Sequence, residues 1–405
     1  MSKLKKIIII VSCIILVVGL AIGGYFLYVN IRENNEYETA LTLVDDLNVE
    51  AGKYIRLKDL IANLNGTEED NFIINTSKIG ENTISFKYKC PHGMEHEKTF
   101  TINVKDTTAP KILSDDYYTI TKGSTADLTK KIFAVDNICG KLQTKILGTY
   151  DVNKVGNYNV IFSAKDDSGN ETLKNVTFKV VEPTPNETKK TTTTKKIEYT
   201  DIVKEHKNRN TMIGIDISGY QKDIDWDLLK KSGVEFVFVK IGYQEGFGGD
   251  LGYDSRFERN MKEANRVGIP VGGYFFSYAK TVDEIKEQTK FVSDGLSKFK
   301  VDLPIYFDWE DWSDFNKQEL SLYDMNLMAH TFQDEMKNYG YESSIYGSAY
   351  YLRTIWAAEE FDKIWMAQYN DKVTYKGKYY IWQRCDYGHI EGIDGSLDVD
   401  IMYLN

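Results

Sequence analysis

Residues 212–243 read MIGIDISGYQKDIDWDLLKKSGVEFVFVKIGY, and this stretch decides the fold of the C-terminal half. Two short apolar runs, 212–215 and 236–239, have the length and composition of buried strands. The polar segment between them ends in Ser232-Gly233, and a glycine just past a helix is a preferred C-terminal cap. The alternation continues with a strand at 305–307 and with helices at 254–267, 282–298 and 320–339. It predicts a parallel sheet, and we expect residues 209–405 to form an irregular β/α (TIM-like) barrel.

Upstream of the barrel, the chain contains an internal repeat. Residues 78–86 (KIGENTISF) align with 154–162 (KVGNYNVIF), and 98–104 (KTFTINV) align with 174–180 (KNVTFKV). Both blocks alternate apolar and polar residues, which is the period of half-buried strands. We therefore expect two all-β sandwiches, at 36–106 and 107–182. Their junction, VKDTTAP at 104–110, resembles the join between tandem bacterial immunoglobulin-like domains, which mostly act as spacers.

The N-terminus predicts a membrane anchor. Lys3, Lys5 and Lys6 precede an uncharged apolar run at 7–29. About 20 apolar residues span a bilayer, whereas the apolar core of a cleaved signal peptide has about 7 to 15. The positive-inside rule places residues 1–6 in the cytoplasm and the rest of the chain outside. A single-pass protein of a Gram-positive cell membrane is the favoured reading, and a cleaved signal peptide is its alternative.

The composition of the chain limits the structures and binding partners that we expect. The Thr/Lys-rich segment at 183–208 cannot bury a core and predicts an extended linker. A net charge of −10 argues against a nucleic-acid partner, because nothing offsets phosphate repulsion. The four cysteines are scattered and indicate no disulfide framework. Cys90, His92 and His96 are one spacing that could bind a metal, but they fall on an expected hairpin, so we expect no metal site.

Four carboxylates follow or flank the apolar runs of the expected barrel. In this architecture the functional residues lie at the ends of the strands. Asp216 follows GI at 214–215, Asp308 and Glu310 belong to PIYFDWE, and Asp398 lies in LDVDI. Alternate residues of a strand face one side, so Asp308 and Glu310 should project together, with α-carbons roughly 6.5 Å apart. Two such neighbours have divergent pKa values, and glycoside hydrolysis needs one carboxylic acid and one carboxylate. All six tryptophans also lie in this half, and aromatic faces stack on sugar rings.

These motifs together resemble one enzyme family. In chain order they are GIDIS at 214–218 with Tyr220-Gln221, FVFVKIG at 236–242, Asp254 with Phe257 and Asn260, VGGYFF at 271–276, YFDWE at 306–310, IYGS at 345–348, WMAQY at 365–369, IWQ at 381–383 and LDVD at 397–400. The set, covering 211–405, is similar to the glycoside hydrolase family 25 muramidases, also called Chalaropsis-type lysozymes.

The resemblance implies cleavage of the β-1,4 bond between N-acetylmuramic acid and N-acetylglucosamine in peptidoglycan, without a cofactor. It implies that Glu310 is the general acid. Asp308 would assist it, by orienting the substrate acetamido group or by stabilising positive charge at the anomeric carbon. Asp216 and Asp398 would line the same cleft, and Asp400 leaves open which of the two nearby carboxylates faces it. Substrate contacts are expected from the following side chains: Tyr274, Tyr346, Trp309, Gln368, Trp382 and Tyr243.

Several alternatives stay open at this point. Phe275 stands where many family members carry a histidine, which affects any hydrogen bond made there. Inverting, retaining and substrate-assisted mechanisms all fit a pair at this spacing. A catalytically silent protein that binds glycan, or a scaffold of a membrane complex with unknown partners, is the rival to an enzyme. Intact carboxylates at 216, 308, 310 and 398 argue for the enzyme.

Overall fold

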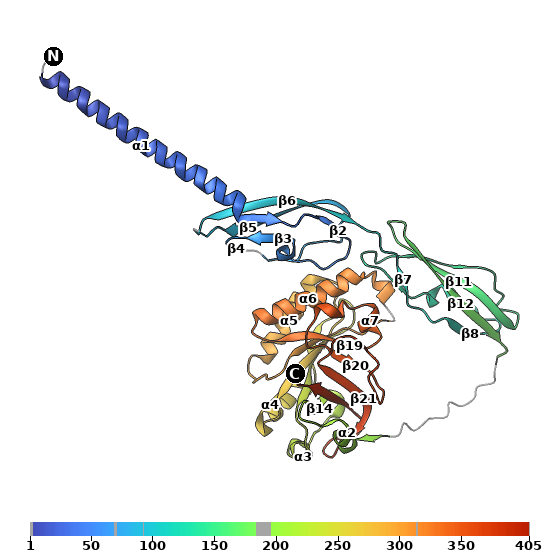
Figure 1. The fold of residues 1–405 in the computed structure, drawn as a ribbon. Coiled ribbons are helices and arrows are strands. Elements are labelled where there is room, and N and C mark those ends of the chain that lie inside the picture. The colour runs from blue at the N-terminus through green and yellow to red at the C-terminus, as the bar shows by residue number, and fades with distance from the viewer. Residues whose placement is uncertain (1–2, 69–70, 92, 184–195, 313–314, 405) are drawn as a thin grey trace. The chain divides into compact units, whose positions relative to one another are not determined.

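The computed structural model describes residues 3–68, 71–91, 93–183, 196–312 and 315–404 (Figure 1). The chain divides into two compact units, Met1–Thr107 and Thr108–Asn405. The division coincides with the expected junction between the two β repeats. The first unit holds a long helix and the first repeat, and the second unit holds the second repeat together with the C-terminal half.

The first unit begins with helix α1, Lys3–Ala40. Within it, Ile14–Glu33 is long and apolar enough to cross a membrane, with a mean hydropathy of 2.2. The helix extends beyond the expected span of 7–29 and through residue 36, where we expected the first sandwich to start. The strands of the first repeat therefore begin only at Leu41.

The first repeat is all β. Its strands are β1 (Leu41–Leu43), β2 (Asn48–Glu50), β3 (Ile61–Leu64), β4 (Thr67–Glu68), β5 (Gly80–Lys89) and β6 (Glu95–Lys105). Four of them form a sheet in the order β2-β6-β5-β4, and β1 pairs with β3. The alternation along β5 and β6 buries Phe86, Tyr88, Ile102 and Val104 on one face.

The second repeat has the same strand pairing. Its strands are β7 (Lys111–Ile112), β8 (Tyr117–Thr121), β9 (Ala134–Val135), β10 (Gln143–Leu147), β11 (Gly156–Lys165) and β12 (Glu171–Val181). The main sheet has the order β10-β11-β12-β8, and β7 pairs with β9. In both repeats a long antiparallel hairpin, β5–β6 or β11–β12, has a short parallel strand on its second arm, β2 or β8. The repeat seen in the sequence is therefore a repeat of structure.

The C-terminal half alternates strands and helices. The strands are β13 (Ile197–Glu198), β14 (Thr211–Ile217), β15 (Val237–Gln244), β16 (Leu251–Tyr253), β17 (Val271–Phe276), β18 (Ile305–Asp308), β19 (Ser343–Ser348), β20 (Trp365–Ala367), β21 (Ile381–His389) and β22 (Leu397–Tyr403). The helices are α2 (Tyr199–His206), α3 (Trp226–Lys231), α4 (Phe257–Val267), α5 (Val282–Leu296), α6 (Leu322–Asn338) and α7 (Tyr351–Thr354). The expected helices at 254–267, 282–298 and 320–339 correspond to α4, α5 and α6.

The sheet of this half closes on itself. Strands pair in the order β21-β20-β19-β18-β17-β15-β14-β22, and β22 also pairs with β21. Neighbours from β14 to β21 are parallel, whereas β22 is antiparallel to both of its partners. Helices flank the outside of the closed sheet (Figure 1). The carboxyl ends of the parallel strands therefore meet at one rim, where a site can be assembled from several strands.

The folded C-terminal half begins before residue 209, within the segment expected to be linker. β13 pairs with β21, and Tyr199 and Ile202 of α2 are buried in the core beneath the sheet. Tyr199 also donates a hydrogen bond to the Ile213 carbonyl at 2.8 Å. The apolar positions of α2 lie on one face, which explains the docking. Of the expected linker, residues 184–195 lie outside the described part of the chain.

Candidate active site

Asp308 and Glu310 lie in one pocket of about 190 Å³. All four residues of β18 are buried between β17 and β19, and the strand ends at Asp308. Glu310 lies two residues beyond that end, so our reason for pairing the two carboxyls, a shared strand, is wrong for Glu310. The chain turn after the strand, with the Trp312 amide donating to the Glu310 carbonyl at 2.8 Å, still keeps both side chains at the pocket.

Asp216 and Asp398 reach the same pocket from β14 and β22. The two residues are register partners in this antiparallel pair, so their side chains lie on the same face. Asp400 is completely buried and its Oδ1 accepts a hydrogen bond from Trp365 Nε1 at 2.8 Å. Of the two nearby carboxylates, Asp398 therefore lines the pocket, and Asp400 does not.

The carboxyls of this region resist ionisation. Burial is the main cause that raises the pKa values of Asp216, Asp308 and Asp400 well above the ordinary range. Burial, followed by the charge of Asp216, raises the pKa of Asp398 to about 9. Neighbouring negative charges add to the effect, because each ionised carboxyl disfavours the next.

Glu310 differs from its neighbours. Its side chain opens to solvent at the pocket mouth, yet the surrounding protein removes enough water to raise its pKa to about 7. The positive charge of Lys240 opposes that shift and also lowers the pKa of Asp308. A carboxyl with a pKa near neutrality can hold a proton and release it during a reaction, which is the requirement for a general acid.

Gln383 connects three side chains of the pocket. Its Nε2 donates to Asp216 Oδ2 at 2.8 Å, and its Oε1 accepts from Tyr346 at 2.8 Å and from Tyr369 at 3.0 Å. These contacts fix which atom of the amide is the donor and hold the Asp216 carboxyl in one orientation. Asp308 differs, because its Oδ1 is buried without a hydrogen-bond partner among the described residues. A buried oxygen of this kind is costly unless a ligand pairs with it.

Of the six side chains expected to contact the substrate, two line the pocket and four do not. Tyr274 and Tyr346 line the pocket. Trp309 is buried and donates to the Ala279 carbonyl, and Trp382 is buried and donates to the Gln368 carbonyl. Neither they nor Gln368 and Tyr243 belong to the pocket lining.

Sequence reasoning did not select three pocket residues, Trp365, Tyr369 and Gln383. Trp382 and Gln383 are adjacent on β21 and therefore face opposite sides of the sheet. We expected the aromatic residue, Trp382, to contact the substrate, but it is Gln383 that lies on the pocket side of the sheet. Phe275, the position at which the resemblance led us to expect a histidine, is completely buried and does not line the pocket. Of the Cys90, His92 and His96 spacing, His92 lies outside the described residues.

Comparison with known proteins agrees with this chemistry. Residues 215–393 match the family model of the glycosyl hydrolases family 25. An autolytic lysozyme of Clostridium acetobutylicum is 28% identical over 192 residues, covering 47% of this chain and 55% of that protein. The uncharacterised protein YegX of Escherichia coli O157:H7 is 24% identical over 199 residues, covering 47% of this chain and 69% of that protein.

Among solved structures, the modular autolysin LytC from Streptococcus pneumoniae is similar, with 23% identity and a TM-score of 0.43. The match covers 60% of this chain and 56% of that one. The family match spans the strands that carry Asp216, Asp308 and Gln383. Residues 215–393, in the C-terminal half of this chain, are therefore a domain of the glycosyl hydrolases family 25.

Proposed function

We propose that this protein is a muramidase that cleaves the β-1,4 bond between N-acetylmuramic acid and N-acetylglucosamine. The observation that carries the proposal is the pairing of Asp308 with Glu310 in the family 25 pocket, with the pKa of Glu310 near 7. Glycoside hydrolysis requires a proton for the departing oxygen and a second carboxyl to support the anomeric centre. Both are available here without a cofactor.

Glu310 is the proposed general acid. At neutral pH a substantial fraction of its carboxyl is protonated, and its position at the pocket mouth gives access to a glycosidic oxygen. After bond cleavage the resulting carboxylate is supported by the positive charge of Lys240. The Glu310 carboxylate then accepts a proton from the incoming water, as the water oxygen forms its bond to the anomeric carbon.

Asp308 is the proposed partner of the substrate acetamido group. Its buried Oδ1 has no hydrogen-bond partner among the described residues, so an N–H of the substrate would satisfy it. Asp216, oriented by Gln383, and Asp398 line the pocket with carboxyl groups, whose oxygen dipoles would face the positive charge that develops on the sugar ring.

We also propose interpretations of helix α1, of the closed sheet and of the two β repeats. We interpret α1 as a single-pass anchor that places the hydrolase outside the cell membrane for local wall remodelling, and the closed sheet as an irregular relative of the β/α barrel. The two β repeats are interpreted as immunoglobulin-like modules. Fractionation of membranes, followed by protease treatment of intact cells, tests the topology.

The experiment that tests the activity is digestion of purified peptidoglycan by the full chain, with new reducing ends identified by mass spectrometry. Reducing-end N-acetylmuramic acid is the expected product. Reducing-end N-acetylglucosamine would keep a glycosidase but overturn the assigned bond. Binding without cleavage on several wall types would favour the rival, a catalytically silent protein that holds glycan.

A further inference from the structure

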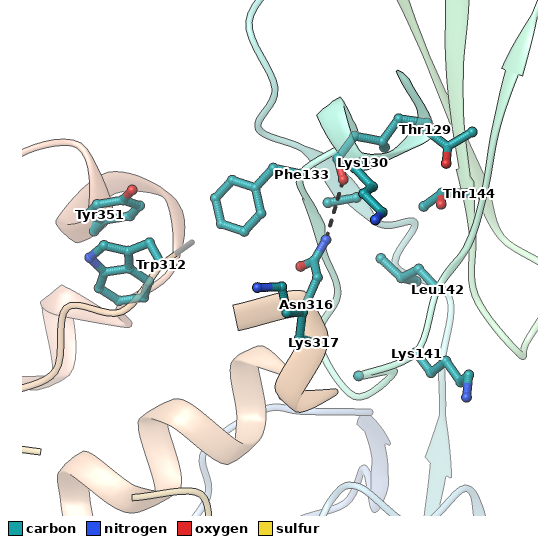
Figure 2. Close-up of a pocket in the computed structure, with 13 residues that line it drawn as sticks. Thr129, Lys130, Phe133, Lys141, Leu142, Thr144, Trp312, Asn316, Lys317 and Tyr351 are labelled. Carbon is teal, nitrogen blue, oxygen red and sulfur yellow. Dashed lines mark hydrogen bonds between the residues drawn. The ribbon is translucent and has the colours of Figure 1, made fainter. Parts of the chain in front are cut away.

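A second cavity lies between the second β repeat and the hydrolase domain, within the compact unit Thr108–Asn405. It measures about 720 Å³. Lys130, Phe133 and Leu142 form its wall on the repeat, and Trp312 and Tyr351 form part of its wall on the hydrolase (Figure 2). Figure 2 shows the Phe133 ring projecting between the Trp312–Tyr351 pair and Asn316.

The two walls are held together by specific contacts. The first backbone N–H groups of α6, those of Leu322 and Tyr323, donate to the carbonyls of Asp136 and Asn137 at 2.8 and 2.9 Å. A helix leaves these N–H groups without internal partners, so the repeat supplies acceptors that the helix needs. Val135 belongs to the hydrolase core. The repeat is therefore docked on the hydrolase, and the cavity between them has a defined shape.

Aromatic contacts connect the cavity with the active site. Trp312 follows the catalytic segment by two residues, its ring lies 4.9 Å from that of Trp309, and it stacks on Tyr351 at 4.0 Å. Tyr351 is close enough to Glu310 for the negative charge of that residue to add to the effect of burial in raising the tyrosine pKa. The cavity thus adjoins the pocket across the Trp312–Tyr351 pair.

The ionisable residues of the cavity differ from those of the active site, which is lined by carboxyl groups. Lys130, Lys141 and Lys317 line it, and none of its described lining residues is an acid. Lys141 forms an ion pair with Glu319 at 2.9 Å. Lys130 has no ion pair among the described residues, although its charge helps to lower the pKa of the exposed Asp127 carboxyl. In a chain with a net charge of −10, three lysines here lie beside apolar side chains.

We propose that this cavity binds the carboxylate-bearing peptide stem that hangs from a muramic acid residue of the substrate. The inference rests on the proposed muramidase function. Apolar side chains of the stem would contact Phe133 and Leu142, and a stem carboxylate would pair with Lys130. An extended peptide of three to five residues spans about 10–17 Å, which allows a stem to leave the glycan cleft and reach a neighbouring cavity.

A bare glycan fits this cavity less well. N-acetylglucosamine carries no charge for the lysines, and the lactyl carboxylate that an amidase exposes on muramic acid brings no apolar side chain for Phe133 and Leu142. The facing surfaces of the Trp312 and Tyr351 rings are already stacked on each other. The phosphate polymer of a teichoic acid is the other anion of a bacterial wall. It lacks apolar side chains for Phe133 and Leu142, so the stem peptide is favoured.

The test compares Lys130→Gln with Lys131→Gln in the full chain. Lys131 is the matched control, because its amino group lies over the Tyr118 ring, 5.6 Å from the centroid, and not in the cavity lining. The substrates are peptidoglycan with intact stems and the same glycan after an amidase has removed them. For Lys130→Gln we expect KM to rise about two- to fivefold on intact peptidoglycan, with kcat unchanged and no effect on the stripped glycan.

A direct measurement separates this inference from the proposed function. Binding of a synthetic stem peptide is followed by tryptophan fluorescence, with Trp312 in the cavity wall as the local reporter. Binding that is weakened by Lys130→Gln and not by Lys131→Gln supports the inference, even if no glycan is cleaved. Absence of binding to the wild type, equal effects of the two variants, or Lys130-dependent binding of polyglycerol phosphate in place of the peptide would overturn it.

Discussion

Replacing Glu310 with glutamine tests the proposed chemistry most directly, because the side chain keeps its size and loses its proton. With a pKa of about 7 the carboxyl is half protonated at pH 7. A glutamic acid at the ordinary 4.5 would be about 0.3% protonated there, so the site raises the acid form about 150-fold. The wild-type kcat should fall about tenfold per pH unit above pH 7, as the acid form is lost.

For Glu310→Gln we expect kcat to fall at least about 10²-fold at pH 6, and the alkaline decline to disappear from the residual rate. The assay is release of reducing ends from purified peptidoglycan by the full chain between pH 5 and 9. Fluorescence melting serves as the folding control, since all six tryptophans lie in the hydrolase domain. Near-normal turnover, or a variant that keeps the wild-type alkaline decline, would refute the assignment of Glu310 as the acid.

Three further variants test the groups around this acid. Lys240→Met removes the charge that lowers the pKa of Asp308 and Glu310, so the alkaline limb of the kcat profile should move to higher pH; an unchanged profile would exclude this coupling. Gln383→Leu leaves its three partners without their hydrogen bonds, at about 1–3 kcal/mol for an unsatisfied buried group, and kcat/KM should drop about tenfold or more in a steady-state assay. Asp400→Asn keeps an acceptor for Trp365 and removes a buried acid whose folded pKa is raised. Such an acid stabilises the fold below its unfolded pKa near 3.8, and that contribution is lost as pH rises through the folded pKa. The Tm of the variant should therefore rise relative to that of the wild type as pH increases. Each kcal/mol of difference in unfolding free energy corresponds to about 2–4 °C in Tm.

Much of the fold follows from periodicity in the sequence. The strand-helix alternation after residue 211 predicts β14, β15, β18 and the helices α4 to α6 because each buries one face or one stripe. The internal repeat predicts the hairpins β5–β6 and β11–β12 for the same reason. The antiparallel course of β22 was not predicted, because strand direction leaves no trace in an apolar pattern.

The sequence predicted those residues of the candidate site that lie at the end of a strand, such as Asp216 and Asp308. Gln383 and Lys240 were missed because an amide or an amine inside a strand has no local signature of function. Their roles depend on neighbours from other strands, Asp216 for the amide and Asp308 for the amine. Docking of the second repeat was also missed, and a spacer was expected, because its contacts with α6 are backbone hydrogen bonds that any sequence can make.

The closure of the sheet by β22 has a consequence for how the enzyme matures. Thr211 pairs with Tyr403 and Asp216 with Asp398, so β14 and the last strand, β22, must meet before the pocket exists. Contacts between residues so far apart in the chain form late and slowly, because a long loop must close first. A nascent chain has no complete carboxyl cluster until its final strand has been made, which delays hydrolytic capacity until synthesis of the domain is finished.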